Sequence, residues 1–467
     1  MKEIDIQKSY IEKVKNINLG KNFKYCILTM GCQLNQNDSE KICGMIEKMG
    51  YIKTDKFEDA DLALFNTCCV RENAEEKLFG KVGEIKKQKE EKGTIIAIGG
   101  CMMQEEHIIK KLKQSYPYVD IIFGTHTLHK LPENLYKALE ENRKIRDVID
   151  IDGEIIEGLP ISRNDNIRAS VTIMNGCNNF CSYCIVPYVR GRERSRAPKD
   201  IIEEVKNLAQ EGYKEITLLG QNVNSYLRVE REKGIEFEEY ENVNSFATLL
   251  RAINKIEGIE RIRFVSPHPK DFTDDVIEAI RDCHKVCKLI HLPLQSGSTM
   301  VLKAMNRKYT KEQFLTVANK LKEIPNISLS TDIIVGFPGE TEEQFLDTLD
   351  VVRQIEFDQI YMFIYSPREG TIGAKMEDHT PYEEKVDRLE RLKALYEETL
   401  PKLNEKMVGN TYKVLVEGKS KTNDNMYSGR SSQNKVVIFE GNEDLVGKVV
   451  NVKIDSQHLW YLKGTIV

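Results

Sequence analysis

The chain has 467 residues, of which 40% are hydrophobic and 30% are charged, and its formal net charge at pH 7 is -5. This length exceeds one ordinary hydrophobic core, so we expect two or three domains. The composition is that of a globular protein and excludes a disordered chain. No apolar run approaches the roughly 20 residues that cross a bilayer, and residues 1–17 lack the apolar core of a signal peptide. We therefore expect a cytoplasmic protein without a membrane segment.

The first part of the chain alternates between strand-like and helix-like segments. Short apolar runs are separated by charged stretches with helical periodicity, such as residues 39–49 and 72–89. This alternation is typical of a parallel sheet covered by helices, which we assign to residues 22–145. The predicted strands are 25–30, 62–65, 95–98 and 119–123.

A second region with strand–helix alternation follows a polar linker near residues 153–166. Thr341 and Gln344 match a capping box that begins one of its helices. Repeated units of this length predict an α/β barrel or an open parallel sheet over residues 163–400, with the chemistry on the loops after the strands. The six predicted strands are 170–174, 215–219, 261–265, 288–292, 328–335 and 359–365.

The last part of the chain changes in character. A long charged helix is predicted over 382–407, and short strands punctuated by glycines follow it. We expect a small antiparallel β-barrel over residues 404–467. Its predicted strands are 412–416, 435–439, 449–454 and a final one that includes Trp460 and Tyr461. Lys413 and Arg430, together with several aromatic residues, suit single-stranded RNA, although some of these aromatics are equally expected in the barrel core.

Three cysteines stand close together in Cys177-Asn-Asn-Phe-Cys181-Ser-Tyr-Cys184, directly after the first strand of the second region. In a reducing compartment, such cysteines favour a metal or cluster site over disulfides. Three thiolates can hold three irons of a [4Fe–4S] cluster and leave the fourth open for a chelating substrate such as S-adenosylmethionine. A structural zinc site needs four ligands, and a ferredoxin has a different spacing and a fourth cysteine, so both alternatives fit less well.

Three more cysteines, Cys32, Cys68 and Cys101, each follow a predicted strand of the first region. Because the carboxyl ends of parallel strands share one edge, we expect the three thiols to converge and to hold a second [4Fe–4S] cluster with an open iron. The alternative is that they are ordinary loop cysteines. If Cys68 is a ligand, the side chain of Cys69 should point away from it. The remaining cysteines are expected to be buried without a function, the last two on one helix face: Cys26, Cys43, Cys283 and Cys287.

Other polar residues lie at the ends of strands or beside the 177–184 segment. Four arginines at alternating positions are expected to contact RNA phosphate or the carboxylate of S-adenosylmethionine, and a solvated loop is the alternative. Three further residues suit S-adenosylmethionine, whereas His268 and His291 are more simply explained as structural. The arginines are Arg190, Arg192, Arg194 and Arg196, and the three residues are Gln221, Asn222 and Asp332.

Together these residues resemble the radical S-adenosylmethionine methylthiotransferases. The resemblance covers nearly the whole chain, and its C-terminal part is similar to a TRAM domain, an RNA-binding barrel. The motifs that carry the resemblance are Met30-Gly-Cys-Gln-Leu-Asn35, Asn66-Thr-Cys-Cys-Val-Arg-Glu72, Gly99-Gly-Cys-Met-Met-Gln104 and Gly176-Cys-Asn-Asn-Phe-Cys-Ser-Tyr-Cys-Ile-Val-Pro-Tyr188. The resemblance implies a partial (β/α)6 barrel in the centre. It also implies two [4Fe–4S] clusters, one on Cys177, Cys181 and Cys184 and an auxiliary one on Cys32, Cys68 and Cys101.

Further motifs resemble the MiaB type of this family, the tRNA 2-methylthio-N6-dimethylallyladenosine synthases. They are Leu219-Gly-Gln-Asn-Val-Asn-Ser-Tyr226 and His291-Leu-Pro-Leu-Gln-Ser-Gly-Ser298. This type methylthiolates carbon 2 of N6-isopentenyladenosine beside the anticodon. The resemblance implies a tRNA anticodon stem-loop as partner, an electron donor such as flavodoxin or ferredoxin, and a monomer, and it assigns catalytic roles to the cluster ligands while leaving any further catalytic residue open. Two alternatives stay open: the MtaB type, which acts on N6-threonylcarbamoyladenosine in tRNA, and a non-catalytic iron–sulfur protein that binds RNA.

Overall fold

A computed structural model describes residues 2–70, 73–149, 155–421, 423 and 425–467. The chain divides into two compact units. The N-terminal unit contains Met1–Asp165, Asn175–Asn178 and Ile185–Arg196, and the barrel unit contains Asn166–Met174, Asn179–Cys184 and Ala197–Val467. Glu72 and Gly153, which begin a predicted helical stretch and the predicted linker, lie outside the described residues.

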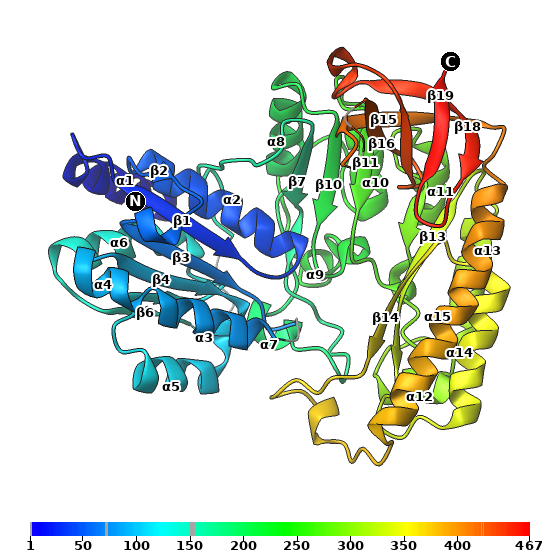
Figure 1. The fold of residues 1–467 in the computed structure, drawn as a ribbon, viewed down its shortest axis with the longest axis horizontal. Helices are drawn as coiled ribbons and strands as arrows, with labels where there is room; N and C mark the ends of the chain where they lie inside the picture. Colours follow the sequence, from blue (N-terminus) through cyan, green and yellow to red (C-terminus); the bar gives the residue numbers. More distant parts are fainter. Residues whose placement is uncertain (1, 71–72, 150–154, 422, 424) are drawn as a thin grey trace. The chain divides into compact units, whose positions relative to one another are not determined.

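The N-terminal unit contains a six-stranded sheet with the order β2-β1-β3-β4-β5-β6, in which all neighbours are parallel (Figure 1). The four predicted strands are confirmed. Two more, β2 and β6, were not predicted because two or three residues are too few to show a periodic pattern. The strands are β1 (Lys24–Thr29), β2 (Ile52–Lys53), β3 (Leu62–Thr67), β4 (Ile95–Gly100), β5 (Ile121–Phe123) and β6 (Ile145–Asp147).

Helices cover both faces of this sheet. Alternate residues of the central strand β3 enter two different cores, Leu62 and Leu64 on one face and Ala63 and Phe65 on the other. The first core is closed by α1 (Glu3–Ile17), α2 (Gln33–Lys48) and α6 (Leu131–Glu140). The second is closed mainly by α3 (Ala74–Glu84) and α5 (Glu106–Ser115), and α4 (Lys86–Lys92) follows α3. Since all six residues of β3 are buried, the carboxyl end of this strand is held firmly where Cys68 follows it.

The barrel unit contains all six predicted parallel strands, with boundaries within two residues of the prediction. They form two sheets, β11-β10-β7 and β12-β13-β14. A single parallel bridge between Ile262 and Val286 connects β11 to the segment before β12, so the strands follow one another as in a partial barrel. The strands are β7 (Arg168–Thr172), β10 (Glu215–Leu219), β11 (Arg261–Phe264), β12 (Leu289–His291), β13 (Ser328–Val335) and β14 (Gln359–Ile364).

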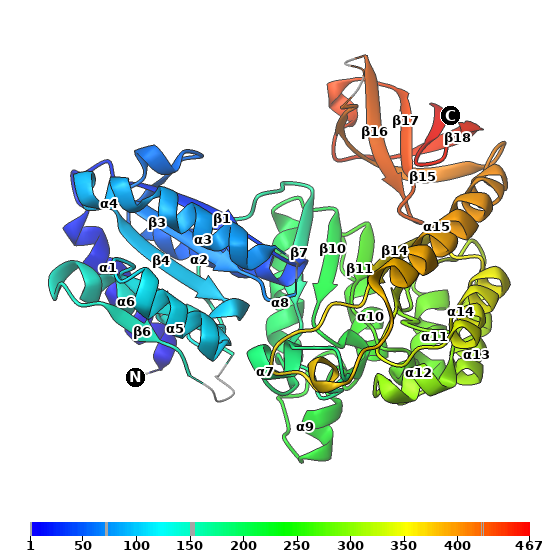
Figure 2. The same ribbon diagram turned by 60° about the horizontal axis from the view of Figure 1, so that its bottom comes forward.

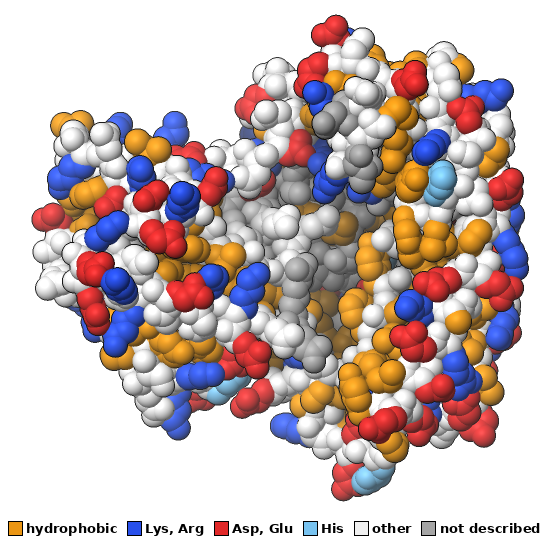
Figure 3. Space-filling model, viewed as in Figure 1, with side chains coloured by type: hydrophobic (Ala, Val, Ile, Leu, Met, Phe, Trp, Pro, Cys, Tyr) orange, Lys and Arg blue, Asp and Glu red, His pale blue; other side chains and the backbone are white. Residues whose placement is uncertain are grey.

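Helices pack on the outside of these strands. The capping box predicted at Thr341 and Gln344 begins α14 (Glu342–Ile355), because each residue's side chain accepts a hydrogen bond from the other's backbone N–H. The other covering helices are α8 (Pro198–Gln210), α10 (Phe246–Asn254), α11 (Asp274–Asp282), α13 (Lys311–Lys322) and α15 (Tyr382–Glu405). Charged side chains lie over the α13–α15 side, and hydrophobic ones gather where β14 runs (Figure 3). Among the described residues, no helix combines the length and apolar character needed to cross a bilayer.

The C-terminal barrel is closed, with the order β15-β16-β17-β19-β18. The expectation of a purely antiparallel barrel is corrected at one pair, because β17 and β19 run parallel. The strand β16 was not predicted, since Ser, Gly and Arg interrupt its apolar pattern, and Trp460 and Tyr461 precede β19 rather than lying in it. The strands are β15 (Thr411–Lys419), β16 (Met426–Ser431), β17 (Val436–Glu440), β18 (Val449–Gln457) and β19 (Leu462–Ile466).

This small barrel lies at the carboxyl end of α15 (Figures 1 and 2). Two arginines at the start of β11 attach it to the parallel strands. Arg261 donates to the carbonyl oxygens of Arg430 and Lys413 at 2.6 and 2.8 Å, and Arg263 donates to that of Ser431 at 3.1 Å. The C-terminal barrel therefore packs against the amino-terminal edge of the parallel strands, opposite to the edge where the cysteine-bearing loop follows β7.

Candidate iron–sulfur sites

In the N-terminal unit, three cysteines follow three neighbouring parallel strands. Cys32 comes after β1, Cys68 directly after β3 and Cys101 directly after β4. Cys32 occupies the N-cap position of α2, a helix of 16 residues whose free N–H groups and dipole favour an anionic group. Cys68 and Cys101 are buried and Cys32 is exposed. The sheet order thus brings the three cysteine-bearing loops to one edge.

Asn35 and Gly31 join the Cys32 and Cys68 loops. The Asn35 side-chain amide donates to the carbonyl oxygens of Met30 at 2.9 Å and Thr67 at 2.7 Å. Gly31 has a φ of +112°, and a Cβ atom there would lie 2.8 Å from the Cys68 sulfur. Glycine is required here because it permits both the backbone conformation and the close approach of the two loops. Asn35 is the last residue of the Met30–Asn35 motif, but its role in holding the two loops together was not predicted.

Arg190 contacts the third cysteine of this group. Its Nε donates to the Cys101 sulfur at 3.2 Å, and its Nη2 donates to Asn35 Oδ1 at 2.6 Å and Asp38 Oδ2 at 2.7 Å. The Arg190 side chain is buried, and so it does not present a surface contact for RNA phosphate, contrary to the expectation from the alternating arginines. Within this unit, Arg190 instead places a positive charge beside a candidate cluster ligand.

Cys69 is close to the same group. Its thiol hydrogen-bonds to Cys101, and this bond together with the nearby Arg190 guanidinium lowers the pKa of Cys101, although burial opposes the shift. Cys69 packs with Cys101, Ile185 and Val189. The expectation was that Cys69 points away from Cys68, and its hydrogen bond is with Cys101, the third candidate ligand of this group.

The three thiols are the ligand type that a [4Fe–4S] cluster requires. Among the described residues, no three Cys, His, Asp or Glu side chains are grouped closely enough to hold one metal ion. A [4Fe–4S] cluster binds each thiolate through a different iron and therefore suits cysteines that are further apart. Three sulfur donors at one sheet edge, with a buried arginine beside one of them, are a chemically suitable set.

The four cysteines that were expected to be buried and without a function are indeed buried. Burial raises the pKa of the Cys26 thiol to about 11 and also raises those of Cys43, Cys283 and Cys287. One detail differs from the prediction: α11 ends at Asp282, so Cys283 and Cys287 follow the helix instead of sharing one of its faces.

The second cysteine group lies on the segment after β7. Cys177 belongs to the N-terminal unit, where its N–H donates to the carbonyl oxygen of Gly191 at 3.1 Å. Gly176 has a φ of +79°, and a Cβ atom there would be 2.0 Å from the carbonyl oxygen of Arg192, so only glycine fits. Cys181 and Cys184 belong to the barrel unit and are joined by a backbone hydrogen bond of 2.9 Å.

A segment between α12 (Thr299–Ala304) and α13 holds the Cys181 end of this loop. Ser182 N–H donates to the carbonyl oxygen of Met305 at 2.9 Å, and the Asn306 side chain donates to that of Phe180 at 2.8 Å. Phe180 has a φ of +48°, an uncommon conformation that these bonds stabilise. The loop position is therefore determined by residues about 120 positions later in the chain.

Arg307, in the same segment, contacts a candidate ligand directly. Its Nη1 donates to the Cys181 sulfur at 3.3 Å and to the Tyr183 hydroxyl at 3.2 Å, and the side chain is only 4% exposed. Its Nη2 donates to the carbonyl oxygen of Pro293 at 3.2 Å. Sequence reasoning missed Arg307, because no local pattern connects it to a loop so distant in the chain.

Two buried polar atoms at the carboxyl side of β10 and β11 have unused hydrogen-bonding capacity. Gln221 Oε1 and His268 Nε2 have no hydrogen-bond partner among the described residues. Burial and then the charge of Arg307 lower the pKa of His268 well below its ordinary value, so the ring is neutral. Since Nδ1 accepts from the Lys270 N–H, Nε2 carries the proton and is a donor. One acceptor and one donor at this edge suit S-adenosylmethionine, whose amino, carboxylate and adenine groups need both.

The other two predicted S-adenosylmethionine residues have protein partners. The Asn222 side chain is buried and donates to Asp271 at 2.9 Å, so it supports the loop that carries Gln221. Asp332 Oδ2 lies 3.2 Å from His291 Nε2, and the centroids of the His291 and Tyr361 rings are 6.1 Å apart. By strand register, Asp332 and Tyr361 lie on the same face of the sheet, and Phe363 follows on it. Tyr361 and Phe363 are exposed, which leaves an aromatic surface beside Asp332 for a ligand.

The remaining predicted RNA contacts differ in exposure. Arg196 is buried and forms two hydrogen bonds with the Glu157 carboxylate, and Arg194 donates to the carbonyl oxygen of Arg190. Arg192 and Lys413 are exposed, and Arg430 is partly exposed beside Glu417. Of the four alternating arginines, Arg192 therefore has the most solvent-exposed side chain.

Family models match three parts of the chain: the radical SAM superfamily over residues 171–352, the uncharacterized protein family UPF0004 over 24–124 and the TRAM domain over 405–467. The tRNA-2-methylthio-N(6)-dimethylallyladenosine synthase of Acetivibrio thermocellus is 51% identical, with 100% of this chain and 96% of that protein covered. The protein of the same name from Clostridium beijerinckii is 52% identical, with 95% of each covered.

Among solved structures, the radical S-adenosylmethionine methyltransferase TsrM from Kitasatospora setae superimposes with a TM-score of 0.53 at 14% identity, covering 73% of each chain. The cobalamin-dependent S-adenosylmethionine radical enzyme OxsB gives a TM-score of 0.50 at 13% identity, covering 81% of this chain and 56% of that one. Identities this low show a shared fold alone.

The six parallel strands, the three-cysteine segment after the first of them and the match to the superfamily define a radical S-adenosylmethionine enzyme with a C-terminal TRAM domain. Such enzymes use S-adenosylmethionine and a [4Fe–4S] cluster. Within this class, the chain belongs to the family of the tRNA-2-methylthio-N(6)-dimethylallyladenosine synthases, with which it shares about half of its residues over its full length.

Proposed function

We propose that this protein attaches a methylthio group to carbon 2 of N6-isopentenyladenosine beside the anticodon of tRNA. The observation that carries the proposal is the presence of two three-cysteine groups, Cys177, Cys181 and Cys184 on one loop and Cys32, Cys68 and Cys101 at one sheet edge. One group alone would serve radical formation. The second is needed for a reaction that also delivers sulfur. The names of the relatives, which cover the full chain, support this substrate.

Each group of candidate residues has its own role in the proposed reaction. Cys177, Cys181 and Cys184 would hold the first [4Fe–4S] cluster, and the chemistry that such a cluster would supply is the one-electron reductive cleavage of S-adenosylmethionine to a 5′-deoxyadenosyl radical. Gln221 and His268 bind S-adenosylmethionine through polar atoms without a partner among the described residues, and Asp332 binds it beside His291. Cys32, Cys68 and Cys101 would hold an auxiliary [4Fe–4S] cluster whose open iron would carry the sulfur atom, and a second S-adenosylmethionine would supply the methyl group. Arg192, Lys413 and Arg430 are the predicted basic residues that the structure leaves at the surface for RNA phosphates.

Several partners follow from this chemistry. The first cluster needs a one-electron donor of low potential, for which flavodoxin or ferredoxin is suitable. The substrate is the anticodon stem-loop of tRNA, consistent with a C-terminal TRAM domain. A single chain carries both cysteine groups, so we infer that a monomer is sufficient, and a reducing cytoplasm would keep its 11 cysteines available.

Mass spectrometry of tRNA nucleosides tests the function directly. In cells that lack this protein, we expect 2-methylthio-N6-isopentenyladenosine to disappear and N6-isopentenyladenosine to accumulate. The chain reintroduced on a plasmid should restore the first nucleoside. If the methylthio derivative of N6-threonylcarbamoyladenosine disappears instead, the reaction is correct and the substrate is wrong. If neither nucleoside changes, the proposal of a tRNA methylthiotransferase is overturned.

Arg307 is proposed to adjust the reduction potential of the first cluster. A buried positive charge and a hydrogen bond to a ligand sulfur stabilise the more negative, reduced state. We expect Arg307→Gln to lower the midpoint potential of the first cluster by at least about 59 mV. For a one-electron couple, this shift makes the ratio of reduced to oxidised cluster ten times smaller at a given solution potential. An EPR-monitored redox titration measures this shift. Lys308→Gln, which removes an exposed neighbouring cation, is the matched control and should leave the potential unchanged. Equal potentials in both variants would exclude this role.

A further inference from the structure

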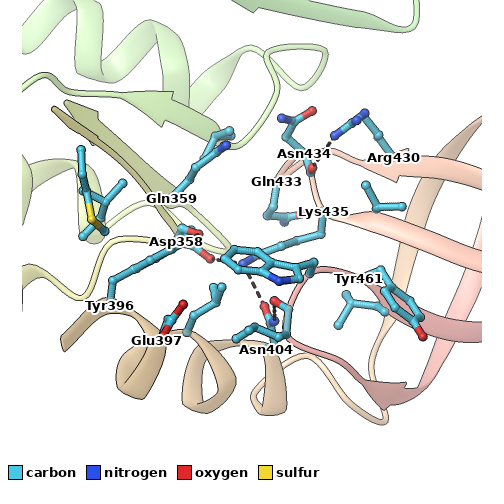
Figure 4. A pocket seen from close by; sticks show the side chains of 18 of the residues that line it. Asp358, Gln359, Tyr396, Glu397, Asn404, Arg430, Gln433, Asn434, Lys435 and Tyr461 are labelled. Carbon is cyan, nitrogen blue, oxygen red and sulfur yellow. Dashed lines mark hydrogen bonds and ion pairs between the residues drawn. The ribbon is translucent and has the colours of Figure 1, made fainter. Parts of the chain in front are cut away.

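A cavity of about 380 Å³ lies between the C-terminal barrel, α15 and the beginning of β14 (Figure 4). Its walls include Gln359 at the start of β14, Tyr396 and Asn404 from α15, and Gln433 and Trp460 from the barrel. The cavity faces the amino-terminal edge of the parallel strands. The Cys181 loop follows the opposite edge, roughly 20 Å away along a strand of six residues. The cavity is therefore separate from the site described above.

Trp460 provides a stacking surface in this cavity. It is the single tryptophan of the chain and is 62% exposed, although a large aromatic ring gains stability from burial. On one side its ring lies 6.4 Å from that of Tyr396, which is buried in the core. An indole held against the protein on one side and open on the other is suited to stack with a planar ligand.

Gln433 provides an unused hydrogen-bond acceptor. Its side chain is 7% exposed and lines the cavity, where Figure 4 shows it beside Lys435. The Nε2 group donates to the carbonyl oxygen of Asn326 at 3.1 Å, which fixes the orientation of the amide. Its Oε1 has no hydrogen-bond partner among the described residues. Buried hydrogen-bond acceptors are normally paired, so we infer that this oxygen accepts a hydrogen bond from an N–H group of a ligand.

The charges around the cavity allow one phosphate but not a strongly anionic ligand. Lys435 is already paired with Asp358 at 3.1 Å and donates to Asn404 at 2.9 Å. Arg430 and Lys393 remain nearer the surface, and Arg430 shares its charge with Glu417. The acidic Glu397 also lies at the rim. Lys393 likewise shares its charge with Glu390, at 3.7 Å, so these two surface cations suit at most a single phosphodiester.

We propose that this cavity binds one unstacked nucleotide of the tRNA. The base stacks on Trp460 and its exocyclic amino group donates to Gln433 Oε1, while the adjoining phosphate lies near Arg430 and Lys393. Adenine, cytosine and guanine carry such an amino group and uracil does not. This inference rests on the proposed function only in taking tRNA as the partner. Because the cavity is distant from the Cys181 loop, the nucleotide is not the reacting one, and the site anchors the tRNA body.

The single tryptophan makes the experiment direct. The full chain is titrated with unmodified full-length tRNA, and the intrinsic tryptophan emission is followed. We expect quenching that saturates, and a tenfold or greater loss of affinity in Trp460→Leu, measured by filter binding. Gln433→Leu should weaken oligo(A) several-fold and leave oligo(U) unchanged. Tyr382→Leu removes an equally exposed aromatic residue of α15 that does not line the cavity, and its affinity should stay that of the wild type.

The two proposals fail in different ways. Unchanged emission at saturating tRNA, or unchanged affinity in a folded Trp460→Leu variant, would overturn the cavity proposal even if methylthiolation is intact. If the methylthio nucleosides persist in cells that lack this protein while tRNA still quenches the tryptophan emission, the proposed function is overturned and the cavity remains an RNA site. Circular dichroism of each variant distinguishes lost binding from lost folding, and a misfolded Trp460→Leu is replaced by Trp460→Tyr, for which a two- to fivefold loss is expected.

Discussion

Replacement of Cys68 by alanine is expected to abolish methylthiolation and to leave the reductive cleavage of S-adenosylmethionine in place. The reason is that Cys68 ends β3 in the N-terminal unit, whereas the cysteines of the first cluster follow β7. The auxiliary cluster would lose one of three ligands, so about half of the protein-bound iron should be lost. Iron analysis, 5′-deoxyadenosine formation and product formation on tRNA carrying N6-isopentenyladenosine measure the three effects. We expect product formation to fall by about a thousandfold or more, since the variant has no sulfur to transfer.

The adjacent cysteine supplies the control for this experiment. Cys69 lies beside Cys68 in sequence and hydrogen-bonds to Cys101, so it is the residue most able to replace a ligand. Cys69→Ala should retain its full iron content and most of the product formation. If Cys69→Ala loses the auxiliary cluster and Cys68→Ala keeps it, the ligand assignment between these two neighbours has to be exchanged. If both variants keep full iron, a ligand role for this pair is excluded.

Replacement of Cys181 by alanine is expected to abolish both reactions. Without this ligand the first cluster is lost, and neither 5′-deoxyadenosine nor the methylthio product should form, again with a decrease of about a thousandfold or more. The remaining iron, about half, should belong to the auxiliary cluster. A matched variant, Cys287→Ala, removes a thiol that is equally buried but far from either group in sequence, and it should cleave S-adenosylmethionine at the normal rate. Cleavage by Cys181→Ala would contradict the assignment of this loop.

The strands of this protein were largely predictable because they are buried on both faces. Parallel strands in an α/β fold are continuous apolar runs, and all six strands of the barrel unit could be placed within two residues. The prediction failed where the local signal is weak, as at β16, whose Ser, Gly and Arg residues interrupt the pattern. It also failed at the pairing of β17 with β19, since the direction of a strand pair depends on where the chain returns and not on the strand's own residues.

The positions of the candidate ligands were also predictable, but their surroundings were not. The spacing of Cys177, Cys181 and Cys184 is a local property of eight residues. The carboxyl ends of parallel strands share one edge, so the Cys32, Cys68 and Cys101 loops could be expected to meet, and β1, β3 and β4 are indeed neighbours. Arg190, however, was expected to contact RNA phosphate or the carboxylate of S-adenosylmethionine, and its side chain is buried against Cys101 and Asp38.

The sequence by itself determined the class of protein, the strand–helix units and the two groups of three cysteines, because each of these depends on residues close together or on periodic burial. The tertiary structure alone decided which residues surround the sulfur atoms and which cavities remain. Arg307 lies about 125 residues from Cys181, and Trp460 more than 60 from Tyr396, and no local pattern relates such residues. Their proximity results from how helices and barrels pack, where shape and burial along the whole chain determine which side chains meet.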